Sequence, residues 1–165
     1  MIKKAVLFLC FYSSIFMFWG CPYSSTVLLG EPIELVKPEL IGKWVVVDEL
    51  SDENPSYYLV SEIDTVRYAV SHYQYSKENS DYTVDDYQFH TTQMGDIMFL
   101  NMMIDGNKDY TFYRLDLKRG EATLFEVTDN IDEKFESSEK MKAFFMKNKN
   151  SSFFYNRDEV LLLKK

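Results

Sequence analysis

Short strand-like segments joined by tight, glycine-marked turns limit what this chain can fold into more than any other feature. From residue 40 onward, β-branched, aromatic and alternating apolar–polar segments recur about every ten to fourteen residues. The links Met94-Gly95-Asp96, Asp105-Gly106-Asn107 and Lys118-Arg119-Gly120 are too short to hold a crossover helix. Neighbouring strands must therefore pair antiparallel, and we predict a mainly β domain, an antiparallel meander of about eight strands.

The expected strands are rich in valine, isoleucine, tyrosine and phenylalanine, and they cover residues 42–47, 56–63, 65–75, 82–91, 97–104, 110–117, 122–128 and 160–163. One short helix is expected near the C-terminus, over residues 137–149, because two serines at its start can cap it. Met141, Phe144 and Phe145 fall at helical spacing and form one apolar face. We expect this face to cover an end or an outer wall of the sheet.

The first 20 residues have the layout of a secretory signal peptide. Lys3 and Lys4 give a positive start, and the apolar run that follows ends before the ~20 residues that a spanning helix needs. Gly20 and Cys21 close the run. A small residue directly before Cys resembles the lipobox of bacterial lipoproteins, which implies cleavage before Cys21 and lipidation of its sulfur. An ordinary signal peptide or an uncleaved anchor, with Cys21 incidental, is the alternative.

We expect the chain to divide into a signal peptide, 1–20, a lipidated Cys with a tether, 21–39, and a β domain, 40–165. Serine, glycine and proline residues suggest the tether. Removal of residues 1–20 deletes two lysines and leaves 16 basic against 26 acidic residues, a net charge of −10. This charge argues against nucleic acid as a partner. The lipid anchor would place the domain outside the cytoplasm, on a membrane of the bacterial cell envelope.

The opening Gly42-Lys43-Trp44, the short strands and the late helix together resemble the lipocalins. The resemblance covers about residues 40–165. It implies a small up-and-down barrel with Trp44 packed at its closed end. A barrel of eight strands has room for side chains alone or for one small ligand.

Two local motifs of catalytic or metal-binding families have simpler interpretations. Residues 105–109 offer oxygens at the spacing of a calcium loop, with Asp116 at position 12, but Tyr110 stands where that loop needs glycine. A hairpin turn is the preferred interpretation. Ser137 and Lys140 match the Ser-x-x-Lys pattern of penicillin-recognising enzymes, but the companion motifs are missing. A helix cap is the preferred role for this serine.

The chain has two histidines, His72 and His90, on different expected strands. With Asp85, Asp86 or Glu78 they could form a metal site, but no short-range ligand spacing supports one. The sequence also lacks a glycine-rich phosphate loop and a Gly-x-Ser-x-Gly elbow. We therefore predict no enzyme activity, no metal and no cofactor.

Two hypotheses for function remain. In the first, a lipid-anchored envelope lipoprotein has a structural role or binds a small apolar ligand, and its barrel is either filled by side chains or forms one apolar pocket. In the second, an acidic inhibitor or immunity-type lipoprotein binds a basic protein partner, to which charge steering would speed association. The second hypothesis rests on acidic residues in loop-like stretches. If the protein has no basic partner, these residues only keep the domain soluble. They are Asp48, Glu49, Asp52, Glu53, Asp85, Asp86, Asp129, Asp132 and Glu133. A ligand-sized cavity would favour the first, and an acidic patch around exposed aromatics the second.

Overall fold

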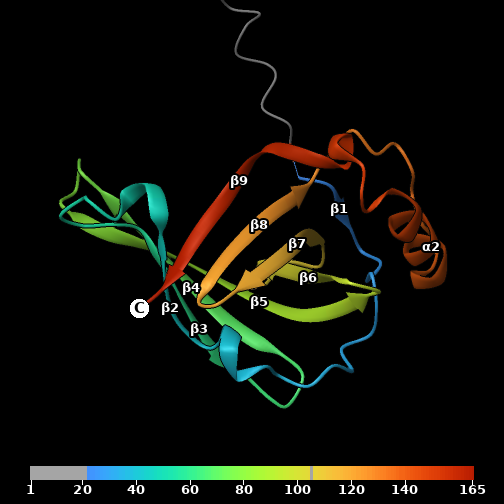
Figure 1. Ribbon diagram of the computed structural model, residues 1–165, viewed down its shortest axis with the longest axis horizontal. Coiled ribbons are helices and arrows are strands. Elements are labelled where there is room, and N and C mark those ends of the chain that lie inside the picture. Colours follow the sequence, from blue (N-terminus) through green and yellow to red (C-terminus); the bar gives the residue numbers. More distant parts are fainter. Residues whose placement is uncertain (1–21, 105) are drawn as a thin grey trace, which may run out of the picture.

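The computed structural model describes residues 22–104 and 106–165, in which a single antiparallel sheet closes on itself (Figure 1). Strands β2 to β9 pair in sequence order, and β9 returns to pair with β2, so eight strands form a barrel. The predicted mainly β fold, a small closed antiparallel barrel with one short helix near the C-terminus, is confirmed. The predicted signal peptide and the lipidation site at Cys21 lie outside the described residues.

The strands are β1 (Ser24–Ser25), β2 (Gly42–Val46), β3 (Tyr57–Glu62), β4 (Tyr68–Ser76), β5 (Asp81–Met94), β6 (Ile97–Ile104), β7 (Tyr110–Lys118), β8 (Glu121–Val127) and β9 (Tyr155–Lys164). The helices are the α-helix α2 (Ser138–Asn148) and the 3-10 turns η2 (Pro38–Leu40), η3 (Val47–Glu49) and η4 (Ser152–Phe154). Gly95, Gly106 and Gly120, in the predicted tight turns, have φ of 68°, 82° and 86°. These left-handed conformations favour glycine, which explains its place in the turns.

One end of the barrel is closed by the chain that precedes β2. Trp44 is 3% exposed, and its indole N–H donates a 2.8 Å hydrogen bond to the Leu40 carbonyl in η2. The backbone N–H of Lys37 donates to the Tyr68 hydroxyl at 2.7 Å, which ties the same segment to β4. The expected burial of Trp44 at the closed end is confirmed.

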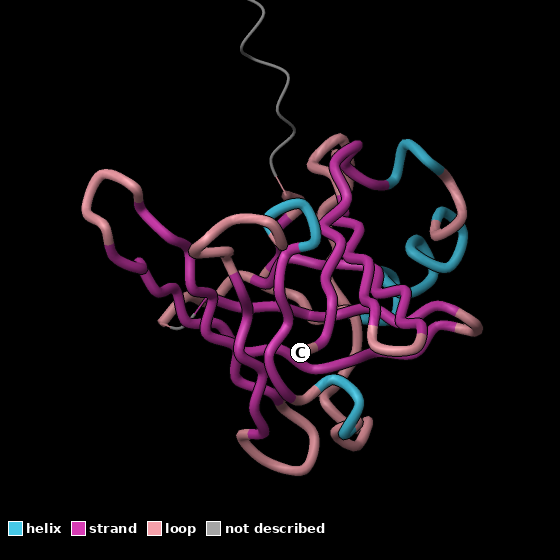
Figure 2. The backbone as a smooth tube through the Cα atoms, turned by 60° about the vertical axis from the view of Figure 1, so that its left-hand side comes forward, coloured by secondary structure: helices cyan, strands magenta, loops and turns pink. Residues whose placement is uncertain are grey.

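Strand alternation divides the apolar residues into two cores on either side of the barrel wall. The inner core fills the barrel with Leu40, Trp44, Val60, Tyr68, Val70, Phe89, Leu100, Leu115, Ala122 and Leu162. The outer core packs α2 and the N-terminal segment against the outside of the wall, with Tyr23, Leu29, Met94, Ile97, Phe99, Phe112, Val127, Met141, Phe145 and Phe154. Figures 1 and 2 both show α2 outside the ring of strands. The helix therefore covers an outer wall.

The apolar face of α2 provides its attachment to the wall. Met141 and Phe145 are fully buried, and Phe144 is half-buried. The Phe145 ring meets the rings of Phe99 and Phe112 edge-on, with centroids 5.5 Å apart in each pair. The predicted helix and its buried face are confirmed to within one residue at each end.

Residues 22–39, whose composition suggests a tether, pack along the barrel. β1 pairs with the start of β7, and Tyr23 and Leu29 are buried. The Leu29 N–H donates a 2.9 Å hydrogen bond to the Asn101 side-chain oxygen. A few apolar residues among the serines and prolines are enough to attach this segment. None of the described helices is long and apolar enough to cross a membrane.

Candidate functional site at the open end of the barrel

The end of the barrel opposite η2 is open, and one hairpin projects beyond it. β4 and β5 pair as far as Ser76 and Asp81, whereas β3 joins β4 only from Tyr57 onward. β6 follows β5 only as far as Tyr87. The tip of the β4–β5 hairpin therefore extends beyond β3 and β6 (Figure 1, left). The segment before β3 runs alongside it, and the Tyr82 hydroxyl donates a 3.3 Å hydrogen bond to the Pro55 carbonyl.

The inner face of this end carries a group of tyrosines, one histidine and carboxylates. Tyr58, His72 and Asp85 lie opposite one another on β3, β4 and β5. Tyr113 on β7 lies opposite Glu126 on β8 in the same way. We call the following set the barrel mouth: Tyr58, His72, Asp85, Tyr87, Tyr113 and Glu126.

Hydrogen bonds and ring stacking order the barrel mouth. The Tyr58 and His72 rings stack, with centroids 4.2 Å apart and an angle of 6° between their planes. The Tyr113 hydroxyl donates a 2.7 Å hydrogen bond to Glu126 Oε1, and Asn156 Nδ2 donates one of 2.6 Å to Glu126 Oε2. Neutral donors thus hold the Glu126 carboxylate, and no Lys or Arg of residues 22–104 and 106–165 forms an ion pair with it.

Burial raises the pKa of each tyrosine of the barrel mouth further above its ordinary value, which already leaves a phenol neutral at pH 7. It raises the pKa of Tyr58 to about 12, and the nearby Tyr87 and Glu49 add to the effect. Burial also raises the pKa of Tyr113, and the Glu126 carboxylate raises it further. These phenols are therefore hydrogen-bond donors at neutral pH.

The two histidines lie in different places. Burial lowers the pKa of His72, although Asp85 and Glu49 act in the opposite direction. His90 faces the outer wall, where its Nε2 lies 2.7 Å from the Gly30 carbonyl oxygen. The hypothetical two-histidine metal site is thus not assembled. Within residues 22–104 and 106–165, no group of three or more His, Cys, Asp or Glu could hold a metal ion.

The other motifs have structural roles. The Asn107 N–H donates a 3.0 Å hydrogen bond to the Ile104 carbonyl and closes the β6–β7 hairpin. Asp116, the twelfth position of the hypothetical calcium loop, pairs with Arg114 at 2.8 Å. Ser137 accepts a 3.4 Å hydrogen bond from the Lys140 N–H, as a helix cap does.

Below the barrel mouth lies a cavity of about 60 Å³. Its walls are almost wholly apolar, formed by Leu40, Trp44, Tyr58, Val60, Val70, Phe89, Leu100, Met102, Leu115, Ala122, Leu124 and Leu162. Pockets for drug-sized ligands have roughly 300–1,000 Å³. The space in this barrel therefore fits only a few carbon atoms.

The outer face of the same strands carries an aromatic surface that we call the tyrosine face: Tyr57, Leu59, Tyr73, Tyr75, Tyr82 and Val84. The Tyr57 and Tyr73 rings stack with centroids 4.6 Å apart. Tyr82 meets Tyr57 and Tyr75 edge-on at 5.5 and 5.3 Å. Leu59 and Val84 are 45% and 46% exposed, and the four tyrosines are half-buried, so this surface is partly open to solvent.

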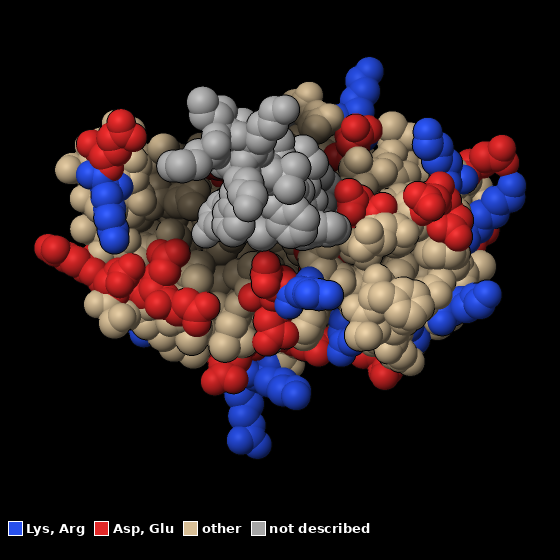
Figure 3. Space-filling view, turned by 90° about the horizontal axis from the view of Figure 1, so that it is seen from above, with Lys and Arg blue, Asp and Glu red and all other residues tan. Residues whose placement is uncertain are grey.

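Acidic residues are concentrated in the segment that carries the tyrosine face, although the Lys43 ammonium lies 3.7 Å from the centroid of the Tyr57 ring. Residues 47–86 hold ten carboxylates and two Lys or Arg, which gives this segment a formal net charge of −8. Figure 3 shows a row of acidic side chains along the lower left of the molecule, whereas most basic side chains lie to the right. Six of the loop-like acids singled out in the sequence belong to this segment: Asp48, Glu49, Asp52, Glu53, Asp85 and Asp86.

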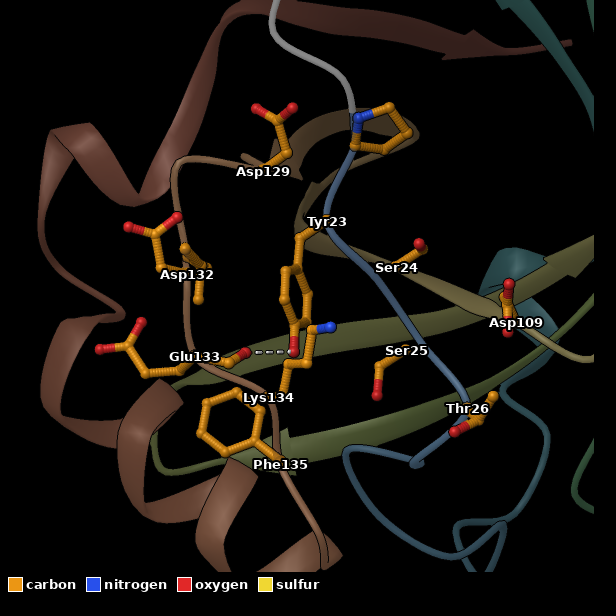
Figure 4. Close-up of a pocket in the computed structure, with 12 residues that line it drawn as sticks. Tyr23, Ser24, Ser25, Thr26, Asp109, Asp129, Asp132, Glu133, Lys134 and Phe135 are labelled. Atoms are coloured by element: carbon orange, nitrogen blue, oxygen red, sulfur yellow. Dashed lines mark hydrogen bonds between the residues drawn. The ribbon is translucent and has the colours of Figure 1, made fainter.

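The other three acids, Asp129, Asp132 and Glu133, line a separate cleft of about 670 Å³ (Figure 4). This cleft lies between residues 22–26 and 129–135. The Tyr23 hydroxyl donates a 3.1 Å hydrogen bond to the Glu133 carbonyl across it. The predicted acidic residues are therefore split between two regions.

Comparisons of the chain with protein-family models, with curated proteins and with solved structures find no match. The sequence does not single out Tyr58, Tyr113 or Glu126. Their inward positions follow from strand alternation, but their meeting depends on the register between strands that close a barrel.

Proposed function

We propose that the domain is a protein-binding module whose partner is basic, and that the tyrosine face is its contact surface. The observation that carries this proposal is the partly exposed aromatic surface, with Leu59 and Val84 exposed beside it, inside a segment with a net charge of −8. It corresponds to the inhibitor or immunity-type hypothesis. We propose no catalytic role.

The composition of the tyrosine face supports this function. Tyrosine is enriched at protein interfaces because its ring buries a large area while its hydroxyl remains hydrogen-bonded. The rings already contact one another, so little conformational freedom is lost on binding. The surrounding carboxylates would speed the approach of a positively charged partner and reject acidic ones.

A photo-crosslinking amino acid placed at Val84 tests this function in cells that produce the protein. Val84 belongs to the tyrosine face and is 46% exposed. Met146 on α2 is equally exposed and serves as the control position. We expect a basic protein to crosslink from position 84 and not from position 146. Crosslinks to acidic proteins only, or the same set of proteins from both positions, would contradict the proposal.

We further propose that the chain is a lipoprotein of the bacterial cell envelope, held at the membrane by lipid on Cys21, and that its barrel is lipocalin-like. The Gly20-Cys21 pair after an apolar run supports the anchor. Gly42-Lys43-Trp44 and the packing of Trp44 at the closed end support the lipocalin-like assignment.

Binding of a small apolar ligand is the second candidate function, and the cavity within the barrel favours it. The apolar lining would accept hydrocarbon, and the volume of about 60 Å³ restricts the ligand to a few carbon atoms. Leu124→Phe would fill this space. If the cavity binds ligand, this variant should lose the binding while keeping the fold.

A further inference from the structure

We propose that the barrel mouth binds an alkylammonium group whose short alkyl chain occupies the cavity below. This inference extends the small-ligand candidate by naming the class of ligand. It does not depend on a protein partner at the tyrosine face.

The shape of the barrel sets the orientation of such a ligand. The turn η2, which includes Leu40, closes the end of the barrel opposite the barrel mouth, and the hydrogen-bonded wall is continuous around the barrel. A ligand therefore enters past the barrel mouth and places its apolar part beneath it. The cavity of about 60 Å³ is roughly twice the ~30 Å³ that a water molecule occupies in the liquid, so it accepts the terminal carbons of a short alkyl chain while the remaining carbons lie at the barrel mouth.

The charges at the entrance select the head group. Glu126 accepts hydrogen bonds from Tyr113 and Asn156, and Glu49 accepts one of 2.6 Å from the Ser56 N–H. In the described part of the chain, none of Glu49, Asp85 and Glu126 forms an ion pair with Lys or Arg. A ligand cation would supply the missing positive charge, whereas a ligand anion would be repelled.

The aromatic rings favour an ammonium over other cations. The faces of tyrosine rings attract alkylammonium groups, which fit among several rings at once. Tyr58 lines the cavity and also stacks on His72, so it connects the apolar space to the polar entrance. The lowered pKa of His72 leaves this imidazole neutral at pH 7, and it does not compete with the cation.

An alkylammonium group can come from a free small amine or from a lysine side chain of a protein. A free amine with a short chain can fill the cavity and leave its charge at the entrance. A lysine carries its ammonium at the tip, so it would reach the barrel mouth with its chain pointing outward. The two sources therefore differ in whether the alkyl part is buried.

Isothermal titration calorimetry of the full chain in lipid nanodiscs tests the inference. The probes are n-butylammonium chloride, the neutral n-butanol and sodium butyrate. We expect n-butylammonium to bind at least about tenfold more tightly than n-butanol, as a hydrogen bond to a charged group implies, and butyrate not to bind. Nα-acetyl-lysine methylamide, whose chain would point outward, identifies the source. Weaker affinity than that of butylammonium supports a free amine with a buried chain, whereas equal affinity would overturn the burial of the chain in the cavity and support lysine recognition.

Glu126→Gln removes the charge and keeps the shape of the side chain. It should reduce the preference for butylammonium over butanol, because Glu49 and Asp85 are kept. Asp86→Asn is the matched control, because Asp86 lies on the outer face of the same hairpin and bonds Ser71. Equal urea midpoints for both variants and the wild type would show that the fold is kept. Equal affinity for butanol and butylammonium would overturn the ammonium proposal but not the binding of a small apolar ligand. If no probe binds, the ammonium proposal and the small-ligand candidate are both overturned.

Discussion

Replacement of Phe145 by alanine should lower the free energy of unfolding by about 4–5 kcal/mol. The Phe145 side chain is 0% exposed and contacts the rings of Phe99, Phe112 and Phe154 edge-on. Truncation of a buried phenylalanine costs ~3–5 kcal/mol, and each aromatic pair contributes ~0.5–1.5 kcal/mol beyond its buried area. Three such pairs place this variant in the upper half of the range.

Urea unfolding followed by far-UV circular dichroism measures this loss. With a slope of ~2 kcal/mol/M, the midpoint should fall by about 2 M. Met146→Ala is the control, because Met146 is the next residue of α2 and is 46% exposed. Its midpoint should change by less than ~0.5 M. If the two variants unfold at the same urea concentration, Phe145 does not attach α2 to the wall and the outer core has been misassigned.

Three further predictions concern other parts of the chain. Trp44→Ala should lower the free energy of unfolding by about 3–5 kcal/mol. In a Trp19→Phe background, the fluorescence maximum of Trp44 should lie at a shorter wavelength than that of free tryptophan in water. A maximum at the wavelength of free tryptophan would contradict its burial. Stability should fall as the pH drops from about 7 towards 5, because burial lowers the pKa values of His72 and His90 and the unfolded chain binds protons that the folded chain does not. Urea midpoints at pH 7.5 and 5 measure the effect, and His72→Gln combined with His90→Gln should remove it. Cys21→Ser should release the domain from membranes, and loss of the acyl mass in intact mass spectrometry checks the cause; a variant that stays bound would contradict the anchor.

Much of the barrel is predictable because local signals and the global fold agree. Alternation along residues 97–104 and 110–117, with a glycine turn between them, predicts a hairpin that the structure contains at nearly the same bounds. The helical face of Met141 and Phe145 is equally local. Such patterns depend on neighbours in sequence, so the sequence alone reveals them.

The start of β9 and the packing of residues 22–39 depend on partners far away in the chain. β9 begins at Tyr155 rather than at residue 160, because β8 supplies partners for a polar stretch that has no strand signal of its own. Tyr23 and Leu29 are buried only because β7, α2 and residues 131–135 form a surface for them. Neither partner surface is visible in the local pattern.

The barrel mouth was beyond prediction for the same reason. Tyr113 and Glu126 lie opposite each other through the register of β7 and β8, and Asn156 reaches Glu126 from β9. The sequence offers Asp85 only as one of three acids that could join the histidines in a hypothetical metal site. The register of β4 and β5 decides between these acids, because it places Asp85 opposite His72 and leaves Asp86 on the outer face.

The most direct test of the central claim measures the affinity of the crosslinked partner, once purified, for the full-length protein at low and high salt. The variant for this test combines Leu59→Ser with Val84→Thr, which removes exposed apolar groups of the tyrosine face. Asp129→Asn, in the separate cleft, is the control. We predict that the double variant and 0.5 M salt each weaken binding by about tenfold or more and that the control has no effect. Affinity that is independent of salt and unchanged in the double variant would contradict the assignment of the tyrosine face as the binding surface.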